Sequence, residues 1–166
     1  TGYAATMVGL PYDDLDRWRA VFPPEVFAQQ FETMAQGFQQ AIAKVRDALG
    51  NAQVSLEQRA AIDEEMRVAE VCAIHFQSVA NQTRFVMNRN AFNEAPAAET
   101  APQHAAAMHA LLDSEIALAQ RMHALQSQDS RFGYEASNHY FYVPTDLVEK
   151  AVNCRSLKED WLKTPQ

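Results

Sequence analysis

Carboxylates and histidines are the side chains of this sequence with the chemistry to hold a metal ion in a helical protein. Di-iron and di-manganese sites in helix bundles use Glu-x-x-His, because a spacing of three residues places both ligands on one face of a helix. No histidine has an Asp or Glu three positions before it; the histidines are His75, His104, His109, His123 and His139. HExxH and CxxC motifs, which are typical of zinc sites, do not occur either. We therefore expect no metal ion and no other cofactor.

A cluster of aspartates near the start of the chain, Asp13, Asp14 and Asp16, suggests a different chemistry. Glycoside hydrolases use two carboxyl groups held about 5 to 10 Å apart across a sugar. Nothing around these aspartates predicts an element that could hold such a pair, and acids in such a segment are typical of turns. We therefore predict no catalytic residue in this chain.

Two glutamates stand where an amphipathic helix requires apolar side chains. Glu115 falls at the centre of the stripe formed by Met108, Leu112, Ala119 and Met122. Glu65 falls among Ile62, Met66 and Ala69. A carboxylate buried alone is costly, so each acid needs a cation, a hydrogen-bond donor or a path to water, and Arg84 is one such cation. Each acid is then either a polar contact that fixes helix packing or the anchor of a binding site.

The segment DSRFGYEASNHYFYVP, residues 129–144, alternates five aromatic residues with polar ones. A connection of this length without helix is typical of a functional or a well-packed loop. In one interpretation Phe132 and Phe141 plug the end of a helix bundle while tyrosine hydroxyls bond to the loop backbone. In the other, the segment presents a recognition surface for a neighbouring domain or a sugar. The residues of that surface are Arg131, Tyr134, Glu135, Asn138, His139 and Tyr140.

Apolar residues recur at helical spacing in four segments, which predict helices over about residues 23–49, 55–90, 101–126 and 145–162. Ser55 with Gln58, and Thr100 with Gln103, have the spacing of a capping box at two of the helix starts. The four stripes cannot be buried alone, so they predict an all-α protein in which residues 23–166 form an antiparallel four-helix bundle. Residues 1–22 do not fit this pattern, and we expect an irregular, extended strap or a linker from a preceding domain.

Composition and charge exclude two classes of partner. A net charge of −7 with no run of Lys or Arg argues against a nucleic-acid surface. No stretch approaches the roughly 20 apolar residues of a membrane span. The sequence begins with Thr and has no targeting segment, so we expect a piece of a longer protein and make no prediction of its compartment.

A family resemblance rests on three stretches, which are GLPYDDLDRWRAVFPPEVFAQQF, IHFQSVANQTRF and RFGYEASNHYFYVPTDLVEKAVNCRSL. They are similar to segments of the all-helical C-terminal domain of large bacterial proteins that resemble glycoside hydrolases, many of them uncharacterised. In those proteins the helical domain follows a catalytic barrel. The resemblance implies an accessory module beside a carbohydrate-active domain, and it carries no catalytic residue over to this chain.

Three functions follow from these observations. The leading hypothesis is a non-catalytic, C-terminal accessory domain that packs on, or completes the cleft of, the catalytic domain preceding it in a glycoside-hydrolase-like parent protein. Its partners are then that domain and, through it, carbohydrate. The second hypothesis is a self-sufficient helical interaction module or homodimer. The third is a small-ligand-binding bundle, which requires a cavity lined by Glu115 or Glu65.

Overall fold

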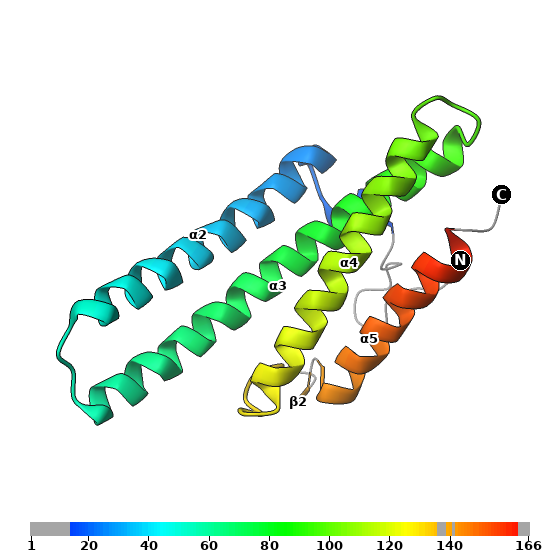
Figure 1. The fold of residues 1–166 in the computed structure, drawn as a ribbon. Coiled ribbons are helices and arrows are strands. Elements are labelled where there is room, and N and C mark those ends of the chain that lie inside the picture. The colour runs from blue at the N-terminus through cyan, green and yellow to red at the C-terminus, as the bar shows by residue number, and fades with distance from the viewer. Residues whose placement is uncertain (1–13, 136–138, 141, 163–166) are drawn as a thin grey trace.

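A computed structural model of the chain describes residues 14–135, 139–140 and 142–162. The described chain is all-helical, with five α-helices that pack against one another and one short two-stranded ladder (Figure 1). In chain order the elements are α1 (Leu15–Trp18), α2 (Pro24–Asn51), α3 (Leu56–Glu94), α4 (Ala101–Gln126), β1 (Tyr134–Glu135), β2 (His139–Tyr140), α5 (Pro144–Ser156) and the π-helix η1 (Leu157–Trp161). Helices α2 to α4 begin and end within a few residues of the expected bounds. The last expected helix is divided into α5 and η1.

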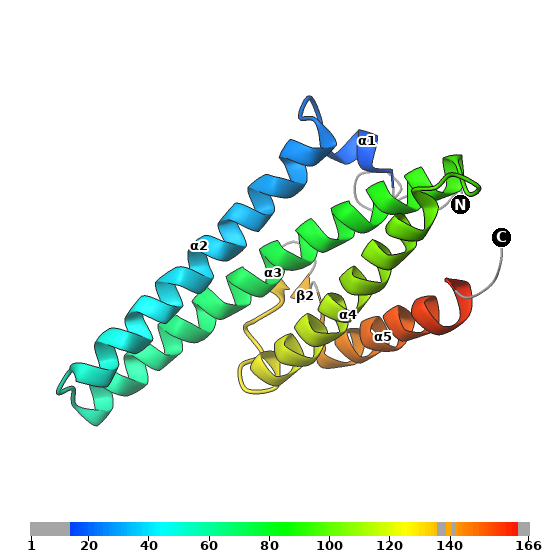
Figure 2. The same cartoon turned by 45° about the horizontal axis from the view of Figure 1, so that its top comes forward.

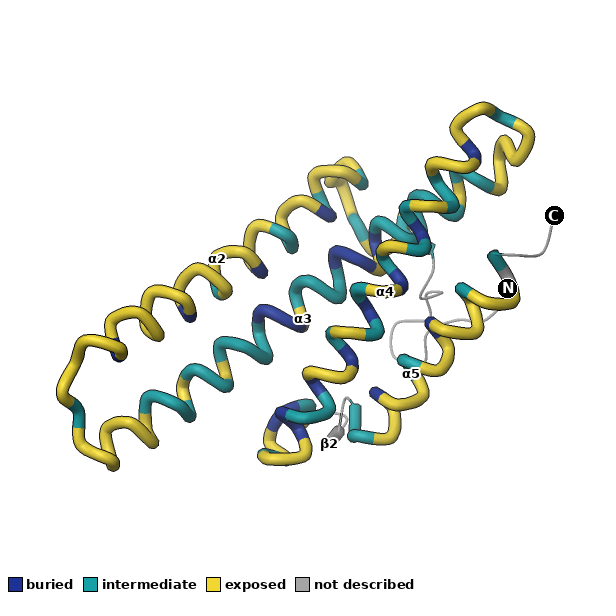
Figure 3. The backbone as a smooth tube through the Cα atoms, viewed as in Figure 1, coloured by how far each residue is buried: buried dark blue, intermediate teal, exposed yellow. Residues whose placement is uncertain are grey.

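Helices α2 and α3 pack through a stripe that repeats every seven residues. The buried residues of α2 are Ala28, Ala35, Ile42 and Leu49. Between them, Phe31 and Phe38 both meet Phe76 of α3, with ring centroids 6.2 Å and 5.9 Å apart. A heptad repeat is typical of coiled-coil packing, and alanines in the seam allow the two backbones to approach closely. The outer surface of α2 is exposed along its whole length (Figure 3).

The helices form an open array. Extensive packing joins α2 to α3, α3 to α4, and α4 to α5, while α2 and α5 lie at opposite edges in both views (Figures 1 and 2). An antiparallel four-helix bundle, in which the first and last helices also meet, is therefore not confirmed. The two edge helices also differ in length, since α5 has 13 residues and α2 has 28. Other segments cover the inner face of α3, α4 and α5 instead.

One of these covering segments is the expected long loop, which folds back as a hairpin. Strands β1 and β2 pair antiparallel, with Tyr134 opposite Tyr140 and Glu135 opposite His139. Phe132 is buried, as the plug interpretation predicts, whereas Phe141 lies outside the described residues. Phe132 packs in a cluster to which helices α3, α4 and α5 contribute. The other members of the cluster are Ile74, Met122, Leu125 and Leu147.

The other covering segment is α1. Residues 1–13 lie outside the described residues, but Leu15–Trp18 form one helical turn where extended backbone was expected. Two ion pairs support this turn, Arg17–Asp14 at 3.0 Å and Arg19–Asp16 at 2.7 Å, because opposite charges three residues apart are neighbours on a helix. The expectation of an extended strap is therefore wrong for this part of the segment.

Candidate functional site

The inner face of the array contains a layer of polar side chains between the hairpin and α1. On each helix the layer follows directly from the hairpin cluster: Ser78 lies one turn beyond Ile74 on α3, and Lys150 one turn beyond Leu147 on α5. Glu115 lies two turns before Met122 on α4. Residues spaced by three, four or seven share one helix face. The three helices therefore direct these side chains to one place.

Glu115 is at the centre of this layer and is only 5% exposed. Its Oε1 accepts a hydrogen bond from Asn81 Nδ2 at 2.8 Å, and its Oε2 accepts one from Ser78 Oγ at 2.9 Å. Lys150 forms an ion pair with the same carboxylate and also donates to Ser78 Oγ at 2.8 Å. The carboxylate thus has both a counter-charge and donors for each oxygen, which is what a buried acid requires.

Asn81 extends the network and is itself 4% exposed. Its Nδ2 also donates to Ser114 Oγ at 2.9 Å, and its Oδ1 accepts from Gln77 Nε2 at 2.9 Å. Within the described residues, the buried side-chain atom without a partner is Gln126 Oε1, which lies outside this layer. A network this fully satisfied specifies one arrangement of the helices.

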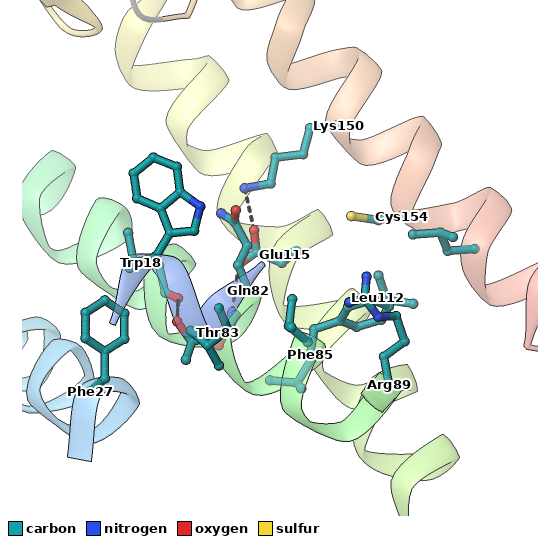
Figure 4. Close-up of a pocket in the computed structure, with 16 residues that line it drawn as sticks. Trp18, Phe27, Gln82, Thr83, Phe85, Arg89, Leu112, Glu115, Lys150 and Cys154 are labelled. Carbon is teal, nitrogen blue, oxygen red and sulfur yellow. Dashed lines mark hydrogen bonds and ion pairs between the residues drawn. The ribbon is translucent and has the colours of Figure 1, made fainter. Parts of the chain in front are cut away.

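A pocket of about 500 Å³ opens beside the polar layer (Figure 4). Glu115 and Lys150 form its polar side, and Trp18 of α1 and Phe27 of α2 lie at one end. Most of the remaining wall is apolar; it consists of Leu15, Val79, Phe85, Val86, Leu111, Leu112, Cys154 and Leu157. Arg89 of α3 adds a second cation to the lining. An apolar concavity of this size with few polar groups is typical of a small-molecule site.

The pocket contains one thiol, and its surroundings do not favour nucleophilic chemistry. Burial raises the pKa of the Cys154 thiol, and the nearby Glu115 carboxylate raises it further, against a smaller opposing effect of Lys150. Only the thiolate is an effective nucleophile. The Ser78 hydroxyl donates to Glu115 Oε2 at 2.9 Å and accepts from Lys150 Nζ at 2.8 Å, so the hydroxyl of the polar layer lies between an acid and an amine that also pair with each other.

The structure places the two predicted buried acids differently. Glu115 is buried, but Glu65 is exposed, and that part of the prediction is wrong. Glu65 lies near the start of α3, before Ala73, the first buried residue of that helix. The predicted role of Arg84 is also wrong: it donates to both oxygens of Glu25, at 3.0 and 2.8 Å, and to Glu32. Arg84 therefore connects α3 to α2 and not to either predicted acid.

The predicted recognition surface is described in part. Arg131 is exposed and bound to Asp129 and Glu64, and Tyr134 is 54% exposed. Backbone pairing brings Glu135, His139 and Tyr140 into the ladder with Tyr134, but the side chains of these three residues are not described. Asn138 lies outside the described residues. This surface lies at the hairpin. The Phe132 cluster separates it from the pocket.

Sequence reasoning missed most of the residues that surround Glu115. Ser78, Asn81 and Lys150 each follow an apolar residue of the same stripe at helical spacing, and this is the signal by which they could have been found. Trp18 lies in the segment for which an extended strap or linker was expected. A single helical turn is too short to show a periodic pattern. The sequence therefore does not indicate that this turn lines a pocket formed by helices far from it in the chain.

Neither a metal site nor a membrane span is found in the part of the chain that the structure describes. No three of its His, Cys, Asp and Glu side chains gather closely enough to hold a metal ion. None of its helices combines the length and the apolar character needed to cross a bilayer.

Comparison with protein-family models, with curated proteins and with solved structures finds no match to this chain.

Proposed function

We propose that this chain is a non-catalytic helical accessory module that packs against a neighbouring domain of a larger protein. The observation that carries the proposal is the free side of α5. There Val148 and Val152 are 51% and 60% exposed, and they border a groove of about 470 Å³ between α4 and α5. Contiguous exposed apolar side chains of this kind commonly mark an interaction surface.

The open array supports the same proposal. The α4–α5 groove is lined by residues of these two helices, while α2 packs mainly against α3 at the other edge of the array (Figure 1). We propose that the neighbouring domain lies over this groove. The hairpin surface of Arg131, Tyr134, Glu135, Asn138, His139 and Tyr140 is proposed as a second contact.

The proposed neighbour is a carbohydrate-active domain, and the sequence resemblance is what supports this. The module itself would contribute no acid to sugar cleavage. Asp14 and Asp16 pair with Arg17 and Arg19, and Glu115 is neutralised by Lys150. A retaining or inverting pair requires carboxyl groups that face a sugar from both sides, and these three acids lack that arrangement.

Cysteine labelling tests the docking surface. Val152→Cys, in a background of Cys72→Ala and Cys154→Ala, should react rapidly with a maleimide in the 166-residue chain. It should be protected in the longer protein that contains the neighbouring domain. Asn153→Cys is the matched control, because this exposed position points away from the groove. Equal labelling of Val152→Cys in both proteins would contradict the proposal, and protection in the short chain at high concentration would favour a homodimer.

A further inference from the structure

We infer that a second pocket, lined by four arginines, binds a small soluble molecule that carries a phosphate group. This arginine pocket has a volume of about 370 Å³, within the range of about 300 to 1,000 Å³ that is usual for small-molecule sites. Its arginines are Arg46 of α2, Arg59 and Arg67 of α3, and Arg121 of α4. It shares no lining residue with the pocket beside Glu115 or with the α4–α5 groove, so the inference does not depend on docking.

The fold, and not the local sequence, brings these arginines together. The chain has a net charge of −7, and its arginines are dispersed along it. Arg59, Asp63 and Arg67 are spaced by four residues and therefore share one face of α3. The buried side chains of Leu49 of α2 and Leu125 of α4 also line the pocket, so the arginines extend from helices that are packed against one another.

The arginines of this pocket differ in what they already bind. Arg121 donates to both oxygens of Glu70, at 2.5 and 2.7 Å. These hydrogen bonds lower the pKa of Glu70 against the opposing effect of burial, and Arg46 contributes a smaller attraction. Within the part of the chain that the structure describes, no hydrogen bond or ion pair engages Arg46, Arg59 or Arg67. Three guanidinium groups at this pocket therefore keep their donors for a ligand.

The surplus of positive charge favours a phosphate group over a carboxylate. The four arginines face two carboxylates in the lining, Asp63 and Glu70, which leaves a net charge of +2. Asp129, outside the lining, also attracts Arg67, but hydrogen bonds from Arg131 are the main influence on that carboxylate. A phosphate monoester has a charge of about −1.5 to −2 near pH 7, and its oxygens accept paired hydrogen bonds from guanidinium groups. A single carboxylate would neutralise only part of the surplus.

Isothermal titration calorimetry at low ionic strength tests the inference with phenyl phosphate and phenyl sulfate. These probes share a ring and a tetrahedral head group and differ by one negative charge. Phenyl phosphate should bind saturably and about tenfold more tightly than phenyl sulfate, the factor expected for one charge-assisted contact. Phosphatidylcholine vesicles with phosphatidic acid present the same phosphate group on a membrane. Sedimentation of the chain with these vesicles, without binding of phenyl phosphate, would contradict a soluble ligand.

Three variants connect the binding to this pocket. Arg67→Gln should weaken phenyl phosphate binding about tenfold, whereas Arg155→Gln, an exposed position of α5 outside the pocket, should leave it unchanged. Asp63→Asn should strengthen binding, because it removes a negative charge from the lining, and a loss of folding cannot imitate this gain. Circular dichroism shows whether each variant is folded. Absence of saturable binding of phenyl phosphate to the folded chain would overturn the inference, as would equal affinity for phenyl sulfate or unchanged binding in Arg67→Gln and Asp63→Asn.

Discussion

Glu115 of α4 and Lys150 of α5 form an ion pair that is buried on one side and open to water on the other. The side chain of Glu115 is 6% exposed and that of Lys150 is 32% exposed. The acid therefore depends on its protein partners, whereas the amine can also be solvated. This asymmetry predicts unequal consequences when the pair is changed.

Removal of the acid should destabilise the fold. Glu115→Ala should lower the free energy of unfolding by about 1 to 3 kcal/mol, because Asn81 loses an acceptor and a gap forms on the inner face. Glu115→Leu should cost less, since it fills the space and Lys150 can turn to water. Glu65→Ala is the control, and at its exposed position the change should stay within about 0.5 kcal/mol. Urea melts measure all three; equal losses at positions 115 and 65 would show that Glu115 is not the centre of a buried network.

Replacement by alanine should change the stability of the protein in opposite directions at two glycines. Gly133 has a φ of +87°, and an added Cβ would lie 2.7 Å from the carbonyl oxygen of Tyr142. Gly133→Ala should therefore destabilise the hairpin by more than about 1 kcal/mol. Gly37 lies inside α2 with nothing within 4 Å of an added Cβ, so Gly37→Ala should stabilise the protein by about 0.5 to 1 kcal/mol. Thermal melts of the two variants provide the comparison, and a stable Gly133→Ala protein would exclude this close approach.

The acid at the base of the hairpin should titrate unusually low. Hydrogen bonds from the Arg131 side chain, then from its backbone, lower the pKa of Asp129 from 3.8 to about 2. Because the folded-state pKa is depressed, the contribution to stability is present above pH 4 and is lost as the pH falls from about 4 to about 2.

Carboxyl NMR titration tests this, since Arg131→Gln should return the pKa of Asp129 toward its ordinary value. Arg17→Gln changes a distant exposed ion pair and should leave Asp129 unaffected. A pKa that stays near 2 without Arg131 would mean that another group holds the carboxylate charged.

The polar side of the hairpin should matter for docking more than for folding. Replacement of Glu135, Asn138 and His139 together by Ala should change the free energy of unfolding by less than about 0.5 kcal/mol. In the longer protein, the same variant should lose docking or activity. Phe132→Ala is the structural comparison and should cost about 3 kcal/mol or more, because Phe132 is buried. If the triple variant keeps both its melting temperature and its activity, the hairpin is only a structural plug.

The helical elements were predictable because their signals are local. The capping box at Ser55 is present, with Gln58 N donating to Ser55 Oγ at 3.1 Å and Ser55 N to Gln58 Oε1 at 2.9 Å. The corresponding prediction for Thr100 is wrong. Backbone hydrogen bonds from Ala98 to Ala95 and from Ala101 to Ala98 place Thr100 in a helical conformation already, so its side chain does not cap α4.

The arrangement of the helices was less predictable than their bounds. A stripe on a helix indicates that a face is covered, but not by which element. Glu65 and Glu115 both lie on such stripes, and only Glu115 lies where α3, α4 and α5 come together. Lys150 was missed because lysine is rarely buried, although its aliphatic stem and partial exposure allow it to reach an inner face.

Both the pocket beside Glu115 and the α4–α5 groove depend on the packing of α5 against α3 and α4. A double-mutant cycle on Glu115 and Lys150 tests most directly whether their ion pair stabilises this packing. Urea unfolding of Glu115→Gln, Lys150→Met and the double variant gives the coupling free energy. The partly exposed lysine reduces the expected coupling to about 1 to 2 kcal/mol. Additive losses, with a coupling below about 0.3 kcal/mol, would contradict this role for the pair.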